Sequence, residues 1–98
     1  MKTNELTGAA LDWAAAKAIG EYKPVAVPSY STDWAQGGPI IEREGISLDQ
    51  YHDFPNWAAS CPPESGFNWF GPTPLIAAMR CYVASNLGDD VDVPEELG

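Results

Sequence analysis

The sequence predicts a small α+β protein in which two to three helices pack with a short two- or three-stranded antiparallel sheet, in an α–β–α sandwich-like arrangement. Three observations carry this prediction. Strong helical patterns stand near both ends of the 98-residue chain, short apolar runs lie between them, and nine glycines and nine prolines mark frequent turns. A chain of this length supports one hydrophobic core. We therefore expect one globular domain over residues 1–88, followed by an acidic tail over residues 89–98.

The first helix is expected between Thr7 and Gly20. Thr7 suits the N-cap position, and Gly20 suits the end of a helix because glycine adopts the C-terminal left-handed conformation without strain. The residues between them follow the spacing of one buried helix face, which comprises Leu11, Ala14, Ala15, Ala18 and Ile19.

A second helix is expected to begin near Asp33. Ser31 or Thr32 would cap it, and the Asp33 carboxylate suits the positive end of the helix dipole. The sequence Gly-Gly-Pro at residues 37–39 interrupts or bends such a helix. Propensity alone therefore predicts two short turns here rather than one continuous helix.

Three short strands are expected after this segment, at residues 46–48, 57–60 and 67–70. The polar stretch over residues 49–56 is typical of a long turn, so the first two strands would form a hairpin with a long loop. Residues 61–66 contain two prolines and a glycine, and they predict a loop.

The last helix is expected from about Thr73 to Leu87. Thr73 caps it, Pro74 takes the first helical position, and Gly88 ends it. This helix is apolar nearly all round, which is typical of a central, buried element. Cys81 falls on it and is expected to be a buried thiol that behaves as a small hydrophobe.

The net charge of −9 is concentrated at the C-terminus, where the last ten residues hold five of the fourteen acids. Such a tail is expected to bury almost nothing, so a chain ending at Gly88 should keep most of its thermal stability. The five lysines and arginines are scattered, which argues against direct nucleic-acid binding. No apolar run is long enough for a membrane helix, and no apolar stretch follows the start as in a signal peptide.

Three phrases carry a resemblance to a known family: LDWA at residues 11–14, STDWAQGGPII at residues 31–41 and GPTPLIAAMRCYVAS at residues 71–85. They resemble the NinX-like phage proteins, a family of unknown function, and the similarity extends to the acidic ending at residues 93–97. The order of features is also similar to the phage α–β–α sandwich domain, which is more helix-forming at residues 37–39. The resemblance implies a phage or prophage gene product in the cytoplasm of the bacterial host. It implies no activity and no catalytic residues.

No catalytic, metal or cofactor site is predicted. His52 is the only histidine, and although acids flank it, no nucleophile motif or triad spacing accompanies it. A solvated loop histidine is the favoured interpretation. A metal set of Asp49, His52, Asp53 and Cys61 lacks any recognised ligand spacing.

The candidate ligand site combines two helix starts, several aromatic residues and one arginine. Helix N-termini offer free N–H groups to an anion, and aromatic rings stack on planar groups. Arg80 stands on an otherwise uncharged helix face, where an ion pair with Asp33 or another buried acid is favoured over anchoring of a ligand carboxylate or phosphate. Plain capping and core packing are the alternatives for the other members. The predicted site comprises Tyr30, Ser31, Thr32, Trp34, Trp69, Thr73 and Arg80.

Three functions of different classes are consistent with the sequence. The favoured hypothesis is a non-enzymatic phage or prophage accessory protein that engages a host or phage partner, or that sequesters a small ligand such as a nucleotide derivative, with counter-defence as one setting. The alternatives are an acidic mimic that inhibits a nucleic-acid-binding host protein and a small hydrolase. The expected partner is thus an unknown host or phage protein or a small anionic ligand. No membrane partner is expected, and homo-oligomer formation stays open.

Overall fold

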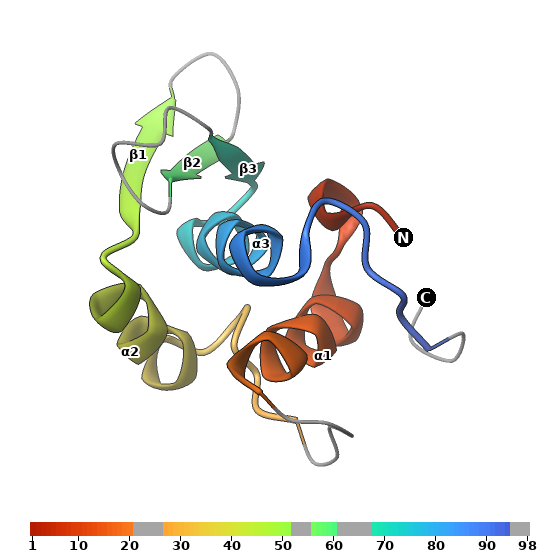
Figure 1. The fold of residues 1–98 in the computed structure, drawn as a ribbon. Coiled ribbons are helices and arrows are strands. Elements are labelled where there is room, and N and C mark those ends of the chain that lie inside the picture. Colours follow the sequence, from red (N-terminus) through yellow and green to blue (C-terminus); the bar gives the residue numbers. More distant parts are fainter. Residues whose placement is uncertain (21–26, 52–55, 61–67, 95–98) are drawn as a thin grey trace.

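The last helix lies at the centre of the fold (Figure 1). The computed structural model describes residues 1–20, 27–51, 56–60 and 68–94. Along the chain, a short 3₁₀ helix precedes three α-helices and three strands. Their bounds are η1 Thr3–Glu5, α1 Gly8–Ile19, α2 Trp34–Glu44, β1 Ser47–Tyr51, β2 Asn56–Ser60, β3 Trp69–Gly71 and α3 Pro74–Leu87.

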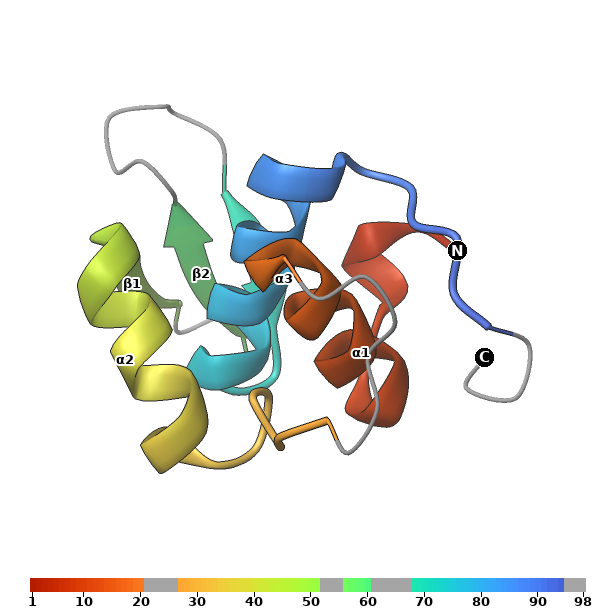
Figure 2. The same ribbon diagram turned by 60° about the horizontal axis from the view of Figure 1, so that its bottom comes forward.

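The elements form layers around α3. The sheet covers one side of this helix, and α1 and α2 pack on it from the opposite side, as Figure 2 also shows. Eight of the fourteen residues of α3 are buried. The predicted α+β class and the central last helix are therefore confirmed. The middle layer is α3, whereas an α–β–α order would place the sheet there.

The sheet has the order β1-β2-β3, and both pairs of neighbours are antiparallel. Leu48, Ala59 and Trp69 lie in one cross-strand row, and all three pack against the core on the side of α3. The three expected strands are confirmed, although β3 begins at Trp69 and residue 67 lies outside the described residues. The expected turn at residues 49–56 is wrong at its ends, because residues 49–51 and 56 pair across the hairpin.

Helix α1 begins and ends where the sequence predicts. Thr7 occupies the N-cap position, but its side chain makes no capping hydrogen bond. The buried face comprises Ala10, Leu11 and residues 14–16, whereas Ile19 is 39% exposed. The small alanine side chains let α1 pack closely on α3.

Helix α2 is continuous, so the prediction of two short turns is wrong. The N-cap is Asp33, whose Oδ1 accepts a hydrogen bond of 3.0 Å from the backbone N–H of Ala35. Pro39 removes one helical bond to the carbonyl of Ala35, and both residues are exposed, so water can take its place. The residue before Pro39 is Gly38, and without a Cβ it avoids the clash that normally excludes this position from helical geometry.

The start of the chain and the residues after α3 are joined by backbone hydrogen bonds. Thr3 is fully buried, its N–H donates to the carbonyl of Asp89 at 2.9 Å, and its Oγ1 donates to that of Gly88 at 2.8 Å. Val91 is 4% exposed, and its N–H donates to the carbonyl of Met1 at 2.8 Å. The expectation that residues after Asp90 bury almost nothing is therefore wrong at Val91, and the boundary at Gly88 stays a prediction.

Asp90 forms ion pairs at the same contact between the start of the chain and the residues after α3. A hydrogen bond from the Met1 ammonium at 3.1 Å, with Lys2 at 3.5 Å, lowers the pKa of Asp90 below its usual value. A lowered carboxyl pKa means that this contact stabilises the fold above the usual pKa and is lost as the pH falls through the lowered one. Since Asp90 is exposed, the effect is small.

Removal of the residues after Gly88 is expected to cost about 2 kcal/mol, because it exposes the core beneath Val91 and leaves buried Thr3 without its backbone acceptor. For a domain of this size the thermal midpoint should fall by roughly 8–16 °C. Thermal unfolding followed by circular dichroism measures this, with Val91→Ala expected to show part of the loss and the exposed Asp92→Ala almost none. If the truncated protein instead unfolds within a few degrees of the full chain, the tail contributes little to stability, as the sequence predicted.

No helix of the described residues is long and apolar enough to span a bilayer.

Candidate functional site

An open groove of about 550 Å³ runs beside β3, between η1 and the middle of α3. Its volume lies within the range of small-ligand pockets. We call it the β3 groove, and in the described part of the chain its lining residues are Asn4, Asn68, Trp69, Phe70, Gly71, Pro72 and Arg80. They come from three separated parts of the chain, which only the packing of η1 and β3 on α3 brings together.

Arg80 connects the three elements that border the β3 groove. It is 9% exposed, its Nε donates to the carbonyl of Leu6 at 2.9 Å, and its Nη1 donates to that of Phe70 at 2.7 Å. Strand β3 is the last of the described strands in the order β1-β2-β3, and the carbonyl of Phe70 accepts from the Arg80 side chain. Arg80 thus satisfies both an edge-strand carbonyl and a buried one.

The ion pair expected for Arg80 is not formed with any acid of the described residues. Asp33 is instead the N-cap of α2, and the guanidinium partners are neutral carbonyls. Burial lowers the pKa of Arg80 below its usual value because the charged form is partly removed from water. The predicted pair with Asp33 is therefore not formed, and among the described residues the arginine is a structural cation without a counter-charge.

The donors of Arg80 are only partly used. A guanidinium carries five N–H groups, and the two bonds described above employ Nε and Nη1. Within the described part of the chain, no residue accepts from Nη2. The group that lines the β3 groove thus keeps donor capacity for another acceptor.

The floor of the β3 groove requires glycine at position 71. A Cβ on Gly71 would lie 2.7 Å from the backbone N of Ala77 and 2.9 Å from Cγ2 of Ile76. Real Cβ atoms do not approach backbone so closely, so a side chain here would push β3 away from α3. Gly71 therefore fixes the distance between the edge strand and the helix that carries Arg80.

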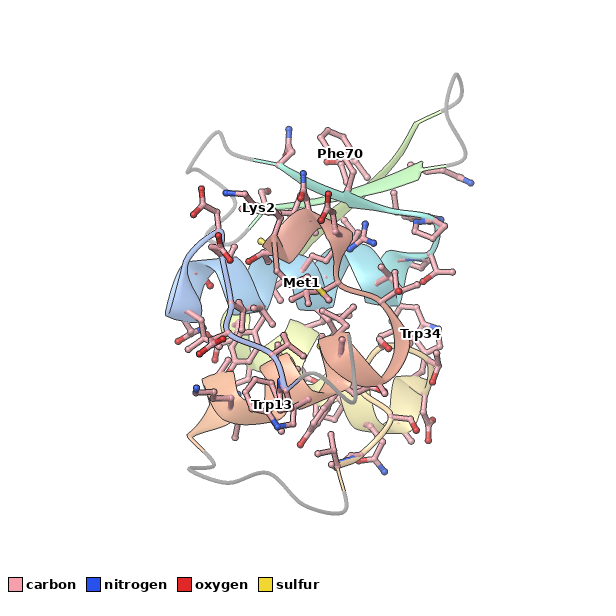
Figure 3. All side chains as sticks on the ribbon, turned by 90° about the vertical axis from the view of Figure 1, so that its right-hand side faces the viewer. Met1, Lys2, Trp13, Trp34 and Phe70 are labelled. Carbon is pink, nitrogen blue, oxygen red and sulfur yellow. The ribbon has the colours of Figure 1, made fainter. Side chains whose placement is uncertain are left out.

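The seven residues of the predicted site are divided between two places. Trp69 and Arg80 line the β3 groove. Thr73 is the N-cap of α3, where its Oγ1 accepts from the N–H of Ile76 at 3.1 Å. Trp34 begins α2 and is 53% exposed, and Figure 3 shows it well apart from Phe70, which projects from the sheet.

The starts of α2 and α3 do lie in contact. A Cβ on Gly37, in the first turn of α2, would be 2.7 Å from Cδ2 of Leu75 at the start of α3, and it would collide with the carbonyl oxygen of Tyr30. The half-buried Tyr30 thus lies close to α2 through its backbone, and it also packs against the core. Thr32 is exposed and donates its N–H to the carbonyl of Ser29 at 3.2 Å. Whether the predicted seven residues share a ligand stays a prediction.

Ser31 is the one buried side chain in the described residues with an unsatisfied polar atom. It is 1% exposed, its N–H donates to Oδ1 of Asp12 at 2.8 Å, and its Oγ has no hydrogen-bond partner. The backbone bond to α1 therefore fixes Ser31 in place, and the hydroxyl contributes nothing to it.

Ser31→Ala should keep the bond to Asp12 and remove the unsatisfied hydroxyl. The free energy of unfolding is expected to stay unchanged or to rise by up to about 1 kcal/mol, since an unsatisfied buried hydroxyl is unfavourable. Chemical denaturation measures this difference, and Asp12→Ala serves as the comparison that loses the bond itself. A clear loss of stability in Ser31→Ala would mean that the hydroxyl has a partner in solution.

The residues considered for catalysis or metal binding give no site in the described part of the chain. No three histidine, cysteine, aspartate or glutamate residues lie close enough there to hold a metal ion. His52, Asp53 and Cys61 lie outside the described residues. Cys81 is 2% exposed, as expected for a buried thiol.

Sequence reasoning missed most of the β3 groove as a site. Asn4 is the clearest example, because it lies 76 positions from Arg80 and no local pattern links the two. Asn68 was expected in the third strand and Pro72 just before the last helix, and neither was predicted to line a site. Trp69 and Arg80 were predicted, because an aromatic residue before a helix start and an arginine on an apolar helix are local signals in the sequence.

Comparison with protein families matches residues 19–86 to the family described as Bacteriophage P22, NinX. No curated protein matches the chain. The matched region runs from the end of α1 to the end of α3, so it contains the sheet, α2 and most of the β3 groove. It covers more than half of the chain and includes two of the three phrases that carry the resemblance. The chain therefore belongs to the NinX family of bacteriophage P22.

Proposed function

We propose that this phage protein is a non-enzymatic binding module that holds its ligand in the β3 groove. The observation that carries the proposal is the chemistry of the lining. The seven lining residues offer two side-chain amides, two aromatic residues and one guanidinium, and none of them carries a hydroxyl, thiol, imidazole or carboxylate. These groups bind and orient a ligand, but they do not provide a nucleophile or a base near neutral pH.

A small ligand fits this groove better than a large partner surface. The volume of about 550 Å³ suits a metabolite-sized molecule, and a few polar groups among apolar ones are typical of such sites. Sequestration of a small signal or nucleotide derivative of the host, as in counter-defence, is a role in which binding alone is sufficient. The bacterial cytoplasm is the corresponding location.

Native mass spectrometry of the protein purified from a bacterial host tests the proposal. We expect a fraction of the wild-type protein to carry a bound small molecule as a defined added mass. Phe70→Ala should lose this mass, because Phe70 lines the β3 groove and is 45% exposed, so the fold does not depend on its side chain. Ile19→Ala is the matched control, since Ile19 is a 39% exposed apolar residue on α1.

A third variant separates the β3 groove from the site predicted by sequence. Trp34→Ala removes an exposed aromatic side chain at the start of α2 that is not among the described lining residues of the β3 groove. Loss of the added mass in Trp34→Ala but not in Phe70→Ala would contradict the proposal and favour the site between the two helix starts. Equal retention in all three variants would place the ligand elsewhere and would also contradict it.

A further inference from the structure

We propose that the β3 groove binds a small anion, a phosphate or carboxylate on a planar aromatic body, with Arg80 as the anchor of the anionic group. This inference rests on the proposed binding function and names the ligand class of the same groove.

The first argument is the charge of Arg80. The side chain is 9% exposed, and its described partners are the carbonyl oxygens of Leu6 and Phe70. Carbonyls satisfy N–H donors but carry no net charge, so the cation is neutralised by neither bond. A cation withdrawn from water without a counter-charge is unfavourable. An anion in the β3 groove would supply the counter-charge that the described residues do not.

The second argument is that the guanidinium is fixed in place and has donors left. Because Nε and Nη1 already donate to Leu6 and Phe70, the guanidinium is held by two bonds from different elements. Nη2 belongs to the same planar group, and Arg80 lines the β3 groove. A fixed guanidinium loses little conformational entropy when it binds, and charge-assisted hydrogen bonds to phosphate or carboxylate are stronger than neutral ones.

The third argument is local charge selection. The protein has a net charge of −9, which disfavours anions over most of its surface. The described lining of the β3 groove differs, because its seven residues include one cation and no acid. The side chains of Asn4 and Asn68 add neutral amides, which donate to an anion and do not repel it.

The fourth argument concerns the body of the ligand. Trp69 and Phe70 are consecutive on β3, and their side chains leave opposite faces of the strand at its free edge. Aromatic residues at a site favour planar ligands, through stacking or edge contacts. Pro72 extends the apolar lining. A ligand that has a planar ring and one acidic group could therefore contact the aromatic residues with its ring and Arg80 with its acidic group.

Paired probes with and without an anionic group test the inference by nuclear magnetic resonance titration. Adenosine 5′-monophosphate is compared with adenosine, and benzoate is compared with benzamide. We expect at least one anion to shift the indole signal of Trp69 and the side-chain amide signals of Asn4 and Asn68. Its Kd should be lower than that of its neutral counterpart by about fivefold or more. The member that binds tells whether phosphate or carboxylate is preferred.

Two variants introduce a charge without disturbing the core, and a third changes the shape of the cation. Asn68→Asp places a carboxylate in the lining of the β3 groove at an exposed position, and it should raise the Kd of the anion about fivefold. Gln36→Glu adds the same charge on exposed α2, outside the groove, and should change the Kd by less than about twofold. Arg80→Lys keeps the charge but loses the planar fork, and binding should weaken if the variant folds.

Three results would overturn the inference. Neutral probes that bind as tightly as their anions would show that charge is not recognised, as would equal effects of Asn68→Asp and Gln36→Glu. Absence of binding by all four probes would also overturn it. These outcomes are distinct from failure of the proposed function, because a retained small molecule that Phe70→Ala removes would still support binding in the β3 groove by a ligand of another class.

Discussion

Arg80→Met should lower the free energy of unfolding by about 3 kcal/mol, one of the two largest effects that we expect for a single substitution. Methionine preserves most of the apolar stem but leaves the carbonyls of Leu6 and Phe70 without their donor. Each lost hydrogen bond to a charged donor costs about 1.5–3 kcal/mol. Relief of the buried charge offsets part of this loss. The two lost bonds outweigh that relief because the Leu6 carbonyl is buried and water cannot replace the donor.

Thermal and urea unfolding would measure the effect, with an expected fall in the midpoint of roughly 12–24 °C. Arg43→Met is the matched control. Arg43 is exposed and donates to Glu44 at 3.0 Å and to the Tyr82 hydroxyl at 3.3 Å, so water can replace these bonds. Its removal should leave the midpoint nearly unchanged. An Arg80→Met variant as stable as the control would show that the two carbonyls are satisfied in another way.

The first and last α-helices were predictable from local patterns, because the signals that begin and end a helix lie within about a dozen residues of one another. Thr73, Pro74 and Gly88 mark the bounds of α3 in the sequence as they do in the structure. The nearly complete apolar surface of α3 predicted its central place for the same reason. The strands were located by short apolar runs, but their ends were not, since pairing across the hairpin extends each of them into polar residues.

The β3 groove and the partners of Arg80 were not predictable, because they depend on contacts between distant parts of the chain. An arginine on an apolar helix indicates a need for acceptors, and an acid is the obvious candidate from sequence. Backbone carbonyls leave no mark in a sequence, so Leu6 and Phe70 could not be identified. The burial of Val91 beside the start of the chain has the same origin. The composition of the tail shows its charge, but it does not show which residue of the tail packs against the core.

The continuity of α2 shows how a local rule fails when glycine has a packing role. The sequence Gly37-Gly38-Pro39 reads as a helix break, yet the helix continues through it. Gly38 makes the position before proline compatible with helical geometry. Gly37 is buried where α2 meets the start of α3. The two glycines thus have different reasons to be there, and substitution of each should have a different result.

Gly37→Ala should lower the free energy of unfolding by about 3 kcal/mol. The new Cβ would collide with the carbonyl oxygen of Tyr30 and would lie 2.7 Å from Cδ2 of Leu75. Leucine can change its rotamer, but a backbone carbonyl can move only if the whole segment before α2 moves. Overpacking of this kind costs 1–3 kcal/mol or more, and it exceeds the roughly 1 kcal/mol that alanine gains over glycine in a helix.

Gly38→Ala is the control for this prediction, because a Cβ there would meet only Cε3 of Trp34 at the ordinary contact distance of 3.8 Å. Alanine favours a helix more than glycine does, but a residue with a Cβ is restricted from helical geometry before Pro39. Because these two effects oppose each other, the free energy of unfolding should change by no more than about 1 kcal/mol. Urea denaturation of both variants compares them directly. The same loss in both would mean that glycine is needed for the proline and not for packing. A Gly37→Ala variant as stable as the wild type would instead mean that α2 can move away from α3 without cost, which the close contact of Gly37 with Tyr30 and Leu75 argues against.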